Sequence, residues 1–298
     1  MSTSSTRSDE LLSPQLLAQL ERLELVSRKI FRGRMKGERR SRRKGQSVEF
    51  ADFRSYVPGD DLRFIDWNLY ARLDKLFLKL FLEEEDLHVY ALIDTSASML
   101  FGDPTKLQYA KQLAAALGFI GLCRADRVKI EGLGTSHRAP GPVLRGRHSL
   151  WRMMQYLDTL ETANVPLVEG VKSFCMRNSG KGILVLITDL MDKQGYEQAI
   201  RFLVAQQLDV YVIQVLSAEE RRPDVTGDLK LVDCEDGDTT EITVSRPLLK
   251  KYEETLAAFV HGAQQFCAKR GIRYLLADTE TPVDEMIGNY LRQRGLVR

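Results

Sequence analysis

The sequence lacks the segments that would carry the chain into a membrane or across it. No stretch comes near the roughly 18 to 20 consecutive apolar residues that a membrane-spanning helix requires. The opening residues, MSTSSTRSDE, have no apolar core of the kind found in signal peptides. We therefore expect a cytoplasmic protein.

Cysteine and histidine are scarce among the 298 residues, with four of each, and neither set has the spacing of a structural zinc site or a disulfide framework. The sequence also has no Gly-rich phosphate loop of the G-x-x-x-x-G-K-[ST] type and no G-x-S-x-G nucleophile elbow. These absences argue against the commonest kinds of hydrolase and nucleotidase. We expect a protein that is not an enzyme.

Charge of either sign is nearly balanced, at a formal net charge of +2, so composition alone indicates no particular partner. The exception is residues 28–44, which contain ten lysines and arginines and one acid, Glu38. Such a run can bind nucleic acid by displacing counterions from phosphates. Its single aromatic residue, Phe31, offers no platform for stacked bases, so a loop in water or against a partner protein is the favoured reading.

Pattern changes along the chain predict three regions. Residues 1–29 form a polar tail and an amphipathic helix, because leucines recur at helical spacing between positions 11 and 23. Residues 30–86 hold the basic loop and a small β-rich module. Residues 87–298 form the main domain, with a hairpin insertion near 229–244 that turns at Asp236-Gly237.

The main domain alternates apolar strands with amphipathic helices, a pattern typical of an α/β fold with a doubly wound, mostly parallel sheet. The predicted strands cover residues 87–93, 127–133, 183–187, 209–215 and 274–277. The predicted helices cover residues 104–122, 150–160, 167–177, 196–206 and 247–269, and a last one starts at residue 282. Asp103 is the predicted cap of the first of them, with Pro104 as its first residue.

Polar side chains follow two of the predicted strands. The segment VYALIDTSASM ends in Asp94, Ser96 and Ser98, and ILVLITD ends in Asp189. In doubly wound sheets, ligand sites form at the carboxyl ends of strands where the strand order reverses. Carboxylate and hydroxyl oxygens are hard ligands that suit Mg²⁺ or Mn²⁺. The structural alternative is that Asp94 caps its loop and that the two hydroxyls form hydrogen bonds with nearby backbone groups.

The D-x-S-x-S strand end resembles the metal-ion-dependent adhesion site of von Willebrand factor A domains, and Asp94, Ser96, Ser98 and Asp189 match that pattern. The resemblance implies a von Willebrand factor A-like fold. It also implies that the serines ligate the ion directly, that the aspartates hold its waters, and that an acidic side chain of a partner completes the shell.

One ligand of that adhesion site, a threonine, has no clean match. The helix register places Val165 at the expected position, and valine cannot bind a metal. Thr162 or Asn164 would have to substitute through a shifted loop, or water would fill the place.

A second and longer pattern lies at Gly45 to Trp67 and reads G-x-S-x-E-F-x-x-x-R-x-Y-x-x-G-D-D-x-R-x-I-D-W. It resembles the signature of the domain-of-unknown-function 58 family, and the resemblance covers about residues 30 to 215. Its opposite charges are dense enough to pair through guanidinium–carboxylate bonds, and because no histidine, cysteine or lysine nucleophile lies beside them, a structural role is favoured over a catalytic one. The members that serve either partner binding or local structure are Arg54, Asp60, Asp61, Arg63, Asp66 and Trp67.

That family resemblance implies an A-domain protein encoded near MoxR-type AAA+ ATPases. The implied role is an adaptor or co-chaperone that presents a client protein to the ATPase. The alternatives are a phosphoryl-transfer hydrolase that uses Asp94 and nucleic-acid binding through residues 28–44. Against the hydrolase, Ser96 stands where haloacid dehalogenase-like phosphatases have the second acid of D-x-D.

Overall fold

The structure is a computed structural model that describes residues 11–26, 49–82, 87–134, 140–178 and 181–298. The basic run 28–44 lies outside the described residues. The chain divides into two compact units, one formed by Met1–Gly33 with Leu87–Arg298 and the other by Arg34–Asp86. Among the helices of the described segments, none has both the length and the apolar character needed to cross a membrane.

The main unit is a mixed α/β structure built on one six-stranded sheet. The strand order is β10-β7-β6-β3-β4-β5, and all neighbours pair in parallel except β5, an antiparallel edge strand. Their bounds are β3 (His88–Ile93), β4 (Arg127–Gly132), β5 (Val143–Arg145), β6 (Gly182–Thr188), β7 (Leu208–Leu216) and β10 (Arg273–Asp278). The prediction missed β5, because three residues are too few to show a strand period.

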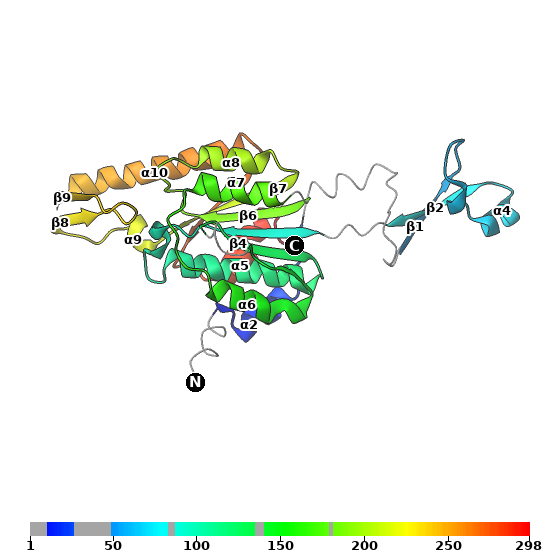
Figure 1. Ribbon diagram of the computed structural model, residues 1–298, viewed down its shortest axis with the longest axis horizontal. Coiled ribbons are helices and arrows are strands. Elements are labelled where there is room, and N and C mark those ends of the chain that lie inside the picture. The colour runs from blue at the N-terminus through cyan, green and yellow to red at the C-terminus, as the bar shows by residue number, and fades with distance from the viewer. Residues whose placement is uncertain (1–10, 27–48, 83–86, 135–139, 179–180) are drawn as a thin grey trace. The chain divides into compact units, whose positions relative to one another are not determined.

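Helices cover both faces of this sheet (Figure 1). In β3, Val89, Ala91 and Ile93 face one apolar core while Tyr90 and Leu92 face the other, as the two-residue period of a strand requires. The first core is closed by α2 (Pro14–Leu20), α5 (Lys106–Cys123), α6 (Leu150–Asp158), α11 (Val283–Glu285) and the π-helical η4 (Met286–Leu291). The second is closed by α7 (Leu167–Arg177), α8 (Glu197–Val204) and α10 (Arg246–Ala268).

Helix α5 is the most deeply buried helix of the first core, and its start positions the site described below. The prediction began this helix at Pro104 with Asp103 as its cap. The structure instead uses Thr105, whose hydroxyl accepts a hydrogen bond from the Gln108 N–H at 3.2 Å. The first helical residue is therefore Lys106, which is completely buried.

A hairpin formed by β8 (Gly227–Val232) and β9 (Thr239–Val244) precedes α10. Only Ala263 and Cys267 of α10 are fully buried, so the helix packs on the sheet through its C-terminal half. Its N-terminal half follows directly after the hairpin, at the same end of the unit in the view of Figure 1. The Tyr252 hydroxyl ties this half to the short helix α9 (Ala218–Arg221) by donating to the Glu220 carbonyl at 2.7 Å.

The second unit pairs β1 (Glu49–Ser55) with β2 (Phe77–Leu82) in an antiparallel hairpin. Between the strands lie the 3-10 turn η1 (Leu62–Phe64) and helix α4 (Trp67–Leu73). The β-rich interpretation missed α4, because this helix has only seven residues and none of them is fully buried, so it shows no buried apolar stripe.

Candidate functional site at the carboxyl ends of strands β3 and β6

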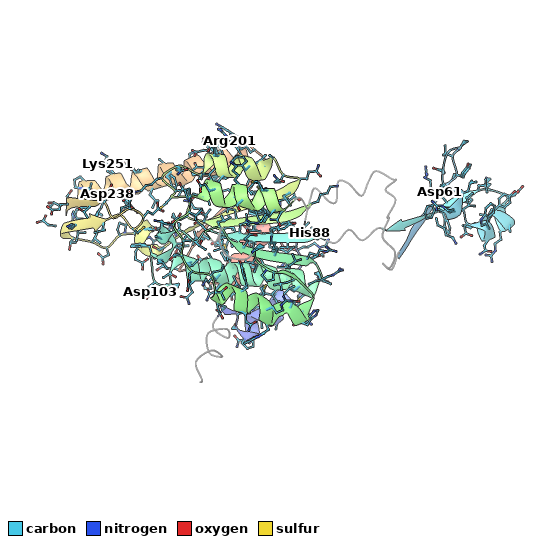
Figure 2. The ribbon with its side chains drawn as sticks, in the orientation of Figure 1. Asp61, His88, Asp103, Arg201, Asp238 and Lys251 are labelled. Atoms are coloured by element: carbon cyan, nitrogen blue, oxygen red, sulfur yellow. The ribbon has the colours of Figure 1, made fainter. Side chains whose placement is uncertain are left out.

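The central strands β3 and β6 end beside each other at the point where the strand order reverses. From β3 the chain places β4 on one side, whereas β6, β7 and β10 follow on the other. Figure 2 places Asp103, in the loop that follows the site, at the opposite end of the sheet from His88, which begins β3. Asp94 and Asp189, which directly follow β3 and β6, therefore lie at the crevice where α/β sheets bind ligands.

Asp94 is held on both of its carboxylate oxygens and is only 6% exposed. Its Oδ1 accepts from the Ser96 N–H at 2.9 Å, and its Oδ2 accepts from the Thr188 hydroxyl at 2.5 Å. Burial raises the pKa of Asp94, and the negative charge of Asp189 raises it further. The carboxyl group is thus fixed in place and short of positive charge.

The Ser96 and Ser98 hydroxyls lie next to Asp94 and bond to each other at 2.9 Å. Both residues are half-buried and belong to the turn that opens into η2 (Ala97–Leu100). Ser96 is the N-cap of that turn, yet its side chain makes no capping bond. The two hydroxyl oxygens and Asp94 therefore form a cluster of three hard oxygen groups on one loop.

The loop expected to supply a threonine lies against the Asp94 loop. The Ala163 N–H donates to the Thr95 carbonyl at 2.8 Å, which places Thr162 one residue from this contact. Val165 is half-buried and brings no oxygen side chain. The Asn164 amide turns instead to the hairpin, where it donates to the Glu235 carbonyl at 3.1 Å.

Asp189 has a cationic partner that the sequence interpretation missed. The Lys106 ammonium lies 2.8 Å from Asp189 Oδ2 and 2.5 Å from Glu220 Oε1. Although burial acts in the opposite direction, the two carboxylates hold the pKa of Lys106 above its usual value. The one signal in the sequence is a lysine at the start of an otherwise apolar helix, and its partners lie 83 and 114 residues away.

Buried polar contacts continue from Asp189 into the sheet. Asp189 Oδ1 accepts from the Met191 N–H at 3.0 Å, and its backbone carbonyl accepts from the Gln214 amide at 2.9 Å. Gln214 in turn accepts from the Tyr274 hydroxyl at 2.5 Å. Since each of these groups is bonded, Asp189 is locked in one orientation.

The turn of the β8–β9 hairpin is pinned close to this edge of the sheet. Lys193 pairs with Asp233 at 2.9 Å and also with Asp236. Burial raises the pKa of Glu235 in this turn, and the charges of Asp192, Asp233 and Asp189 add to the effect. Acidic side chains of the hairpin turn therefore lie close enough to Asp189 for their charges to interact.

The oxygen groups fit a hard divalent cation in kind. Asp94, Ser96 and Ser98 offer one carboxylate and two hydroxyls, and the carboxylate has about four lone-pair sites, not all of which its hydrogen bonds occupy. In the part of the chain that the structure describes, no group of three or more His, Cys, Asp or Glu side chains could hold a metal, so a cation here would depend on the hydroxyls. Asp189 would contribute to the cation site while one of its oxygens is already paired with the Lys106 ammonium.

The charged signature residues lie in the second unit and bond among themselves. Arg54 pairs with Asp60 at 2.8 Å, and Asp61 caps η1 and pairs with Arg63 at 2.6 Å (Figure 2 labels Asp61). Each charged group in these pairs therefore has a partner within the same unit.

The last two signature residues mark the start of α4. Asp66 caps the helix through the N–H groups of Asn68 and Leu69 and lies 3.1 Å from Lys79. Trp67 is 61% exposed, and its ring meets that of Tyr70 edge to face. The acids and arginines thus hold the unit together, and the tryptophan is left on its surface.

Fold and site together define an α/β protein with a carboxylate and hydroxyl cluster at the switch point of its sheet. Residues 52–261 match the family described as "Protein of unknown function DUF58", and the chain belongs to this family. Relatives include the uncharacterized proteins Rv1480 of Mycobacterium tuberculosis and Mb1516 of Mycobacterium bovis. Each is 26% identical over 252 residues, which cover 82% of this chain and 79% of the relative.

Two solved structures have a loosely similar shape. One is the conserved hypothetical protein BatB from Bacteroides thetaiotaomicron, with a TM-score of 0.44 over 70% of this chain and 98% of that one. The other is an aerotolerance-related membrane protein from Bacteroides fragilis, with a TM-score of 0.41 over 70% and 99%. Both are 16% identical in sequence, and at these scores the likeness implies nothing about function.

Proposed function

We propose that this protein is a non-enzymatic interaction module of the von Willebrand factor A type, which grips an acidic side chain of a partner protein at the strand-end site. We further propose that it works in the cytoplasm as an adaptor or co-chaperone for a MoxR-type AAA+ ATPase. The observation that carries the proposal is the placement of Asp94 and Asp189 at adjacent strand ends, with the paired hydroxyls of Ser96 and Ser98 beside Asp94.

A bound Mg²⁺ or Mn²⁺ would supply a positive centre for the partner's carboxylate. Ser96 and Ser98 would hold the ion directly, and Asp94 and Asp189 would orient its water ligands. Thr162 is the nearest threonine in the neighbouring loop and would contribute only after a shift of that loop. The hydrogen bonds that already fix both aspartates support this role, because a pre-ordered set of oxygens loses little freedom on binding.

The environment of Asp94 favours binding over phosphoryl transfer. An attacking carboxylate needs an ionised oxygen that is open to the substrate. Both Asp94 oxygens accept hydrogen bonds, the residue is buried, and its raised pKa favours the protonated form. A cation could still share the remaining lone pairs.

The second unit supports a role in partner binding. A two-stranded hairpin is only marginally stable by itself. Among the described side chains of this unit, Ile65 and Leu78 are buried, whereas seven large apolar side chains are exposed. Single exposed apolar residues are common, but a dense set marks an interaction surface. The exposed members are Phe53, Val57, Leu62, Phe64, Trp67, Tyr70 and Leu73.

Affinity capture tests the proposed function. The full chain, immobilised, would be offered a lysate of its own organism in MgCl2 or in EDTA, and the MoxR-type ATPase would be quantified in the eluate. We expect retention in MgCl2 that is lost in EDTA and in Asp94→Asn but kept in Asp103→Asn, a neighbouring exposed acid. Equal retention by Asp94→Asn and the native chain would contradict a role for this site.

A further inference from the structure

Lys106 is an uncommon feature, because a lysine is rarely buried completely and then requires compensating negative groups. Here its ammonium lies between Asp189 and Glu220, at 2.8 and 2.5 Å. The two carboxylates are themselves anchored, since Asp189 also accepts from the Met191 N–H and Glu220 from the Ser217 N–H. The three charged groups therefore form a rigid buried unit.

This unit is part of the electrostatic balance of the strand-end site. Asp94, Asp189 and Glu220 are three carboxylates, and Lys106 is the one ammonium bonded to this group within the described residues. A cation bound beside Asp94 would favour its ionised form. With all four groups ionised, the excess is two negative charges, which one divalent cation would balance. Without the ammonium the excess would be three, and two carboxylates would have lost their partner.

We propose that Lys106 is a tethered counter-cation that limits the affinity of the site for divalent cations. It neutralises Asp189 from the protein side, so the ion is held mainly by the Asp94 loop. An ion bound through few charges keeps more attraction for a partner's carboxylate. The inference rests on the proposed function in placing the ion at this site, but it concerns the charge of Lys106 alone.

A neutral side chain at position 106 therefore creates a need for a divalent cation. Breaking a buried ion pair on one side leaves an uncompensated charge and destabilises the fold strongly. In Lys106→Gln, Mn²⁺ can replace the lost charge, and because it binds only the folded state it restores stability. Removal of one positive charge next to the cation site strengthens cation binding by at least about tenfold at the effective dielectric constant of a protein site.

The experiment is a thermal-unfolding titration of the full chain with MnCl2 after removal of metals, at constant ionic strength. The variants are Lys106→Gln and, as a matched control, Lys111→Gln. Lys111 lies in the same helix, but its Nζ donates to the Leu160 carbonyl. We expect Lys106→Gln to melt below the native chain without metal and to reach half-saturation at a MnCl2 concentration at least about tenfold lower. Lys111→Gln should reach half-saturation at the same MnCl2 concentration as the native chain.

A double variant, Lys106→Gln with Asp189→Asn, locates the effect. This variant removes the ammonium together with the more buried of its two carboxylate partners, so that only Glu220, which is half-buried and also accepts from the Ser217 N–H, loses an ion pair. We expect this variant to recover much of the lost stability and to lose the tight response to MnCl2. A tight response that survives would place the cation elsewhere and overturn the proposal.

The outcomes separate this inference from the proposed function. The inference is overturned if Lys106→Gln has the same or weaker Mn²⁺ response as the native chain, or stays unfolded in saturating MnCl2. A response in Lys106→Gln but none in the native chain supports the counter-cation and contradicts the cation-dependent grip of the native protein. Equal responses in both chains contradict the counter-cation role of Lys106 and support cation binding by the native protein.

Discussion

At the scale of single residues, the site combines two acids with opposite environments. Asp189 faces an ammonium, whereas Asp94 receives only neutral donors and lies near the charge of Asp189. Burial of a carboxylate without a cation favours its protonated form. The two aspartates, which look alike in the sequence, are therefore not equivalent in the fold.

The raised pKa of Asp94 makes stability depend on pH. In the unfolded chain the pKa of this carboxyl group is about 3.9, and in the folded chain the group keeps its proton to higher pH. The folded state thus binds more protons between the two pKa values, and stability falls as pH rises through that window. Above the folded pKa the whole penalty is present.

Asp94→Asn removes this penalty, because the asparagine amide can donate to Thr188 and carries no charge. In EDTA at pH 7 we expect a melting temperature roughly 2 to 4 °C above that of the native chain, the shift that about 1 kcal/mol gives in a domain of this size. The difference should close below pH about 4. An equal difference at both pH values would refute the account of Asp94.

At the scale of secondary structure elements, the site depends on close contact between β3 and β6. Gly182 begins β6 opposite His88, and a Cβ at this glycine would lie 2.0 Å from the His88 carbonyl oxygen. Backbone cannot yield as a flexible side chain can. The glycine therefore allows the close approach of β3 and β6, the two strands that carry Asp94 and Asp189 at their ends.

We predict that Gly182→Ala destabilises the protein by about 2 to 3 kcal/mol, the usual cost of forcing atoms into packed structure. Gly262→Ala is the control, because this glycine lies in helix α10 and a Cβ added there would meet no neighbouring atom within 4 Å. It should stabilise by about 0.5 to 1 kcal/mol. Urea unfolding of both variants measures the contrast, and similar values would refute it.

Helix α4 depends on a single side chain at its start. Asp66 accepts from the N–H groups of Asn68 and Leu69 and pairs with Lys79. We expect Asp66→Ala to speed hydrogen exchange of these two amides, because no oxygen remains to cap the helix. Asp66→Asn keeps a capping oxygen and should leave the exchange close to that of the native chain. Equal exchange in both variants would remove Asp66 from this role.

At the scale of the whole molecule, the alternation of strands and helices could be predicted because each element follows a local period. The helix 167–177 has the predicted bounds, and strand 183–187 differs by one residue at each end. The sheet order then brings the strand ends carrying Asp94 and Asp189 together, as a parallel sheet requires.

Other features depend on contacts that no local pattern contains. Lys106 meets partners 83 and 114 residues away, and neither Asp189 nor Glu220 has a neighbour in the sequence that indicates it. Strand β5 exists because its three residues pair with β4, not because of their own period. The signature acids and arginines could be predicted to pair with one another, as Arg54 does with Asp60 and Arg63 with Asp61, but the helix caps formed by Asp61 and Asp66 could not.

The most direct test of the account is thermal unfolding of the full chain across a titration with MgCl2, at constant ionic strength and after treatment with EDTA. The native chain and Asp103→Asn should gain stability at millimolar Mg²⁺, whereas Asp94→Asn should not, because a ligand of the folded state raises the melting temperature only where its site is intact. If Asp94→Asn gains as much as the native chain, or the native chain gains nothing, the strand-end site does not hold the cation and the proposed grip is contradicted.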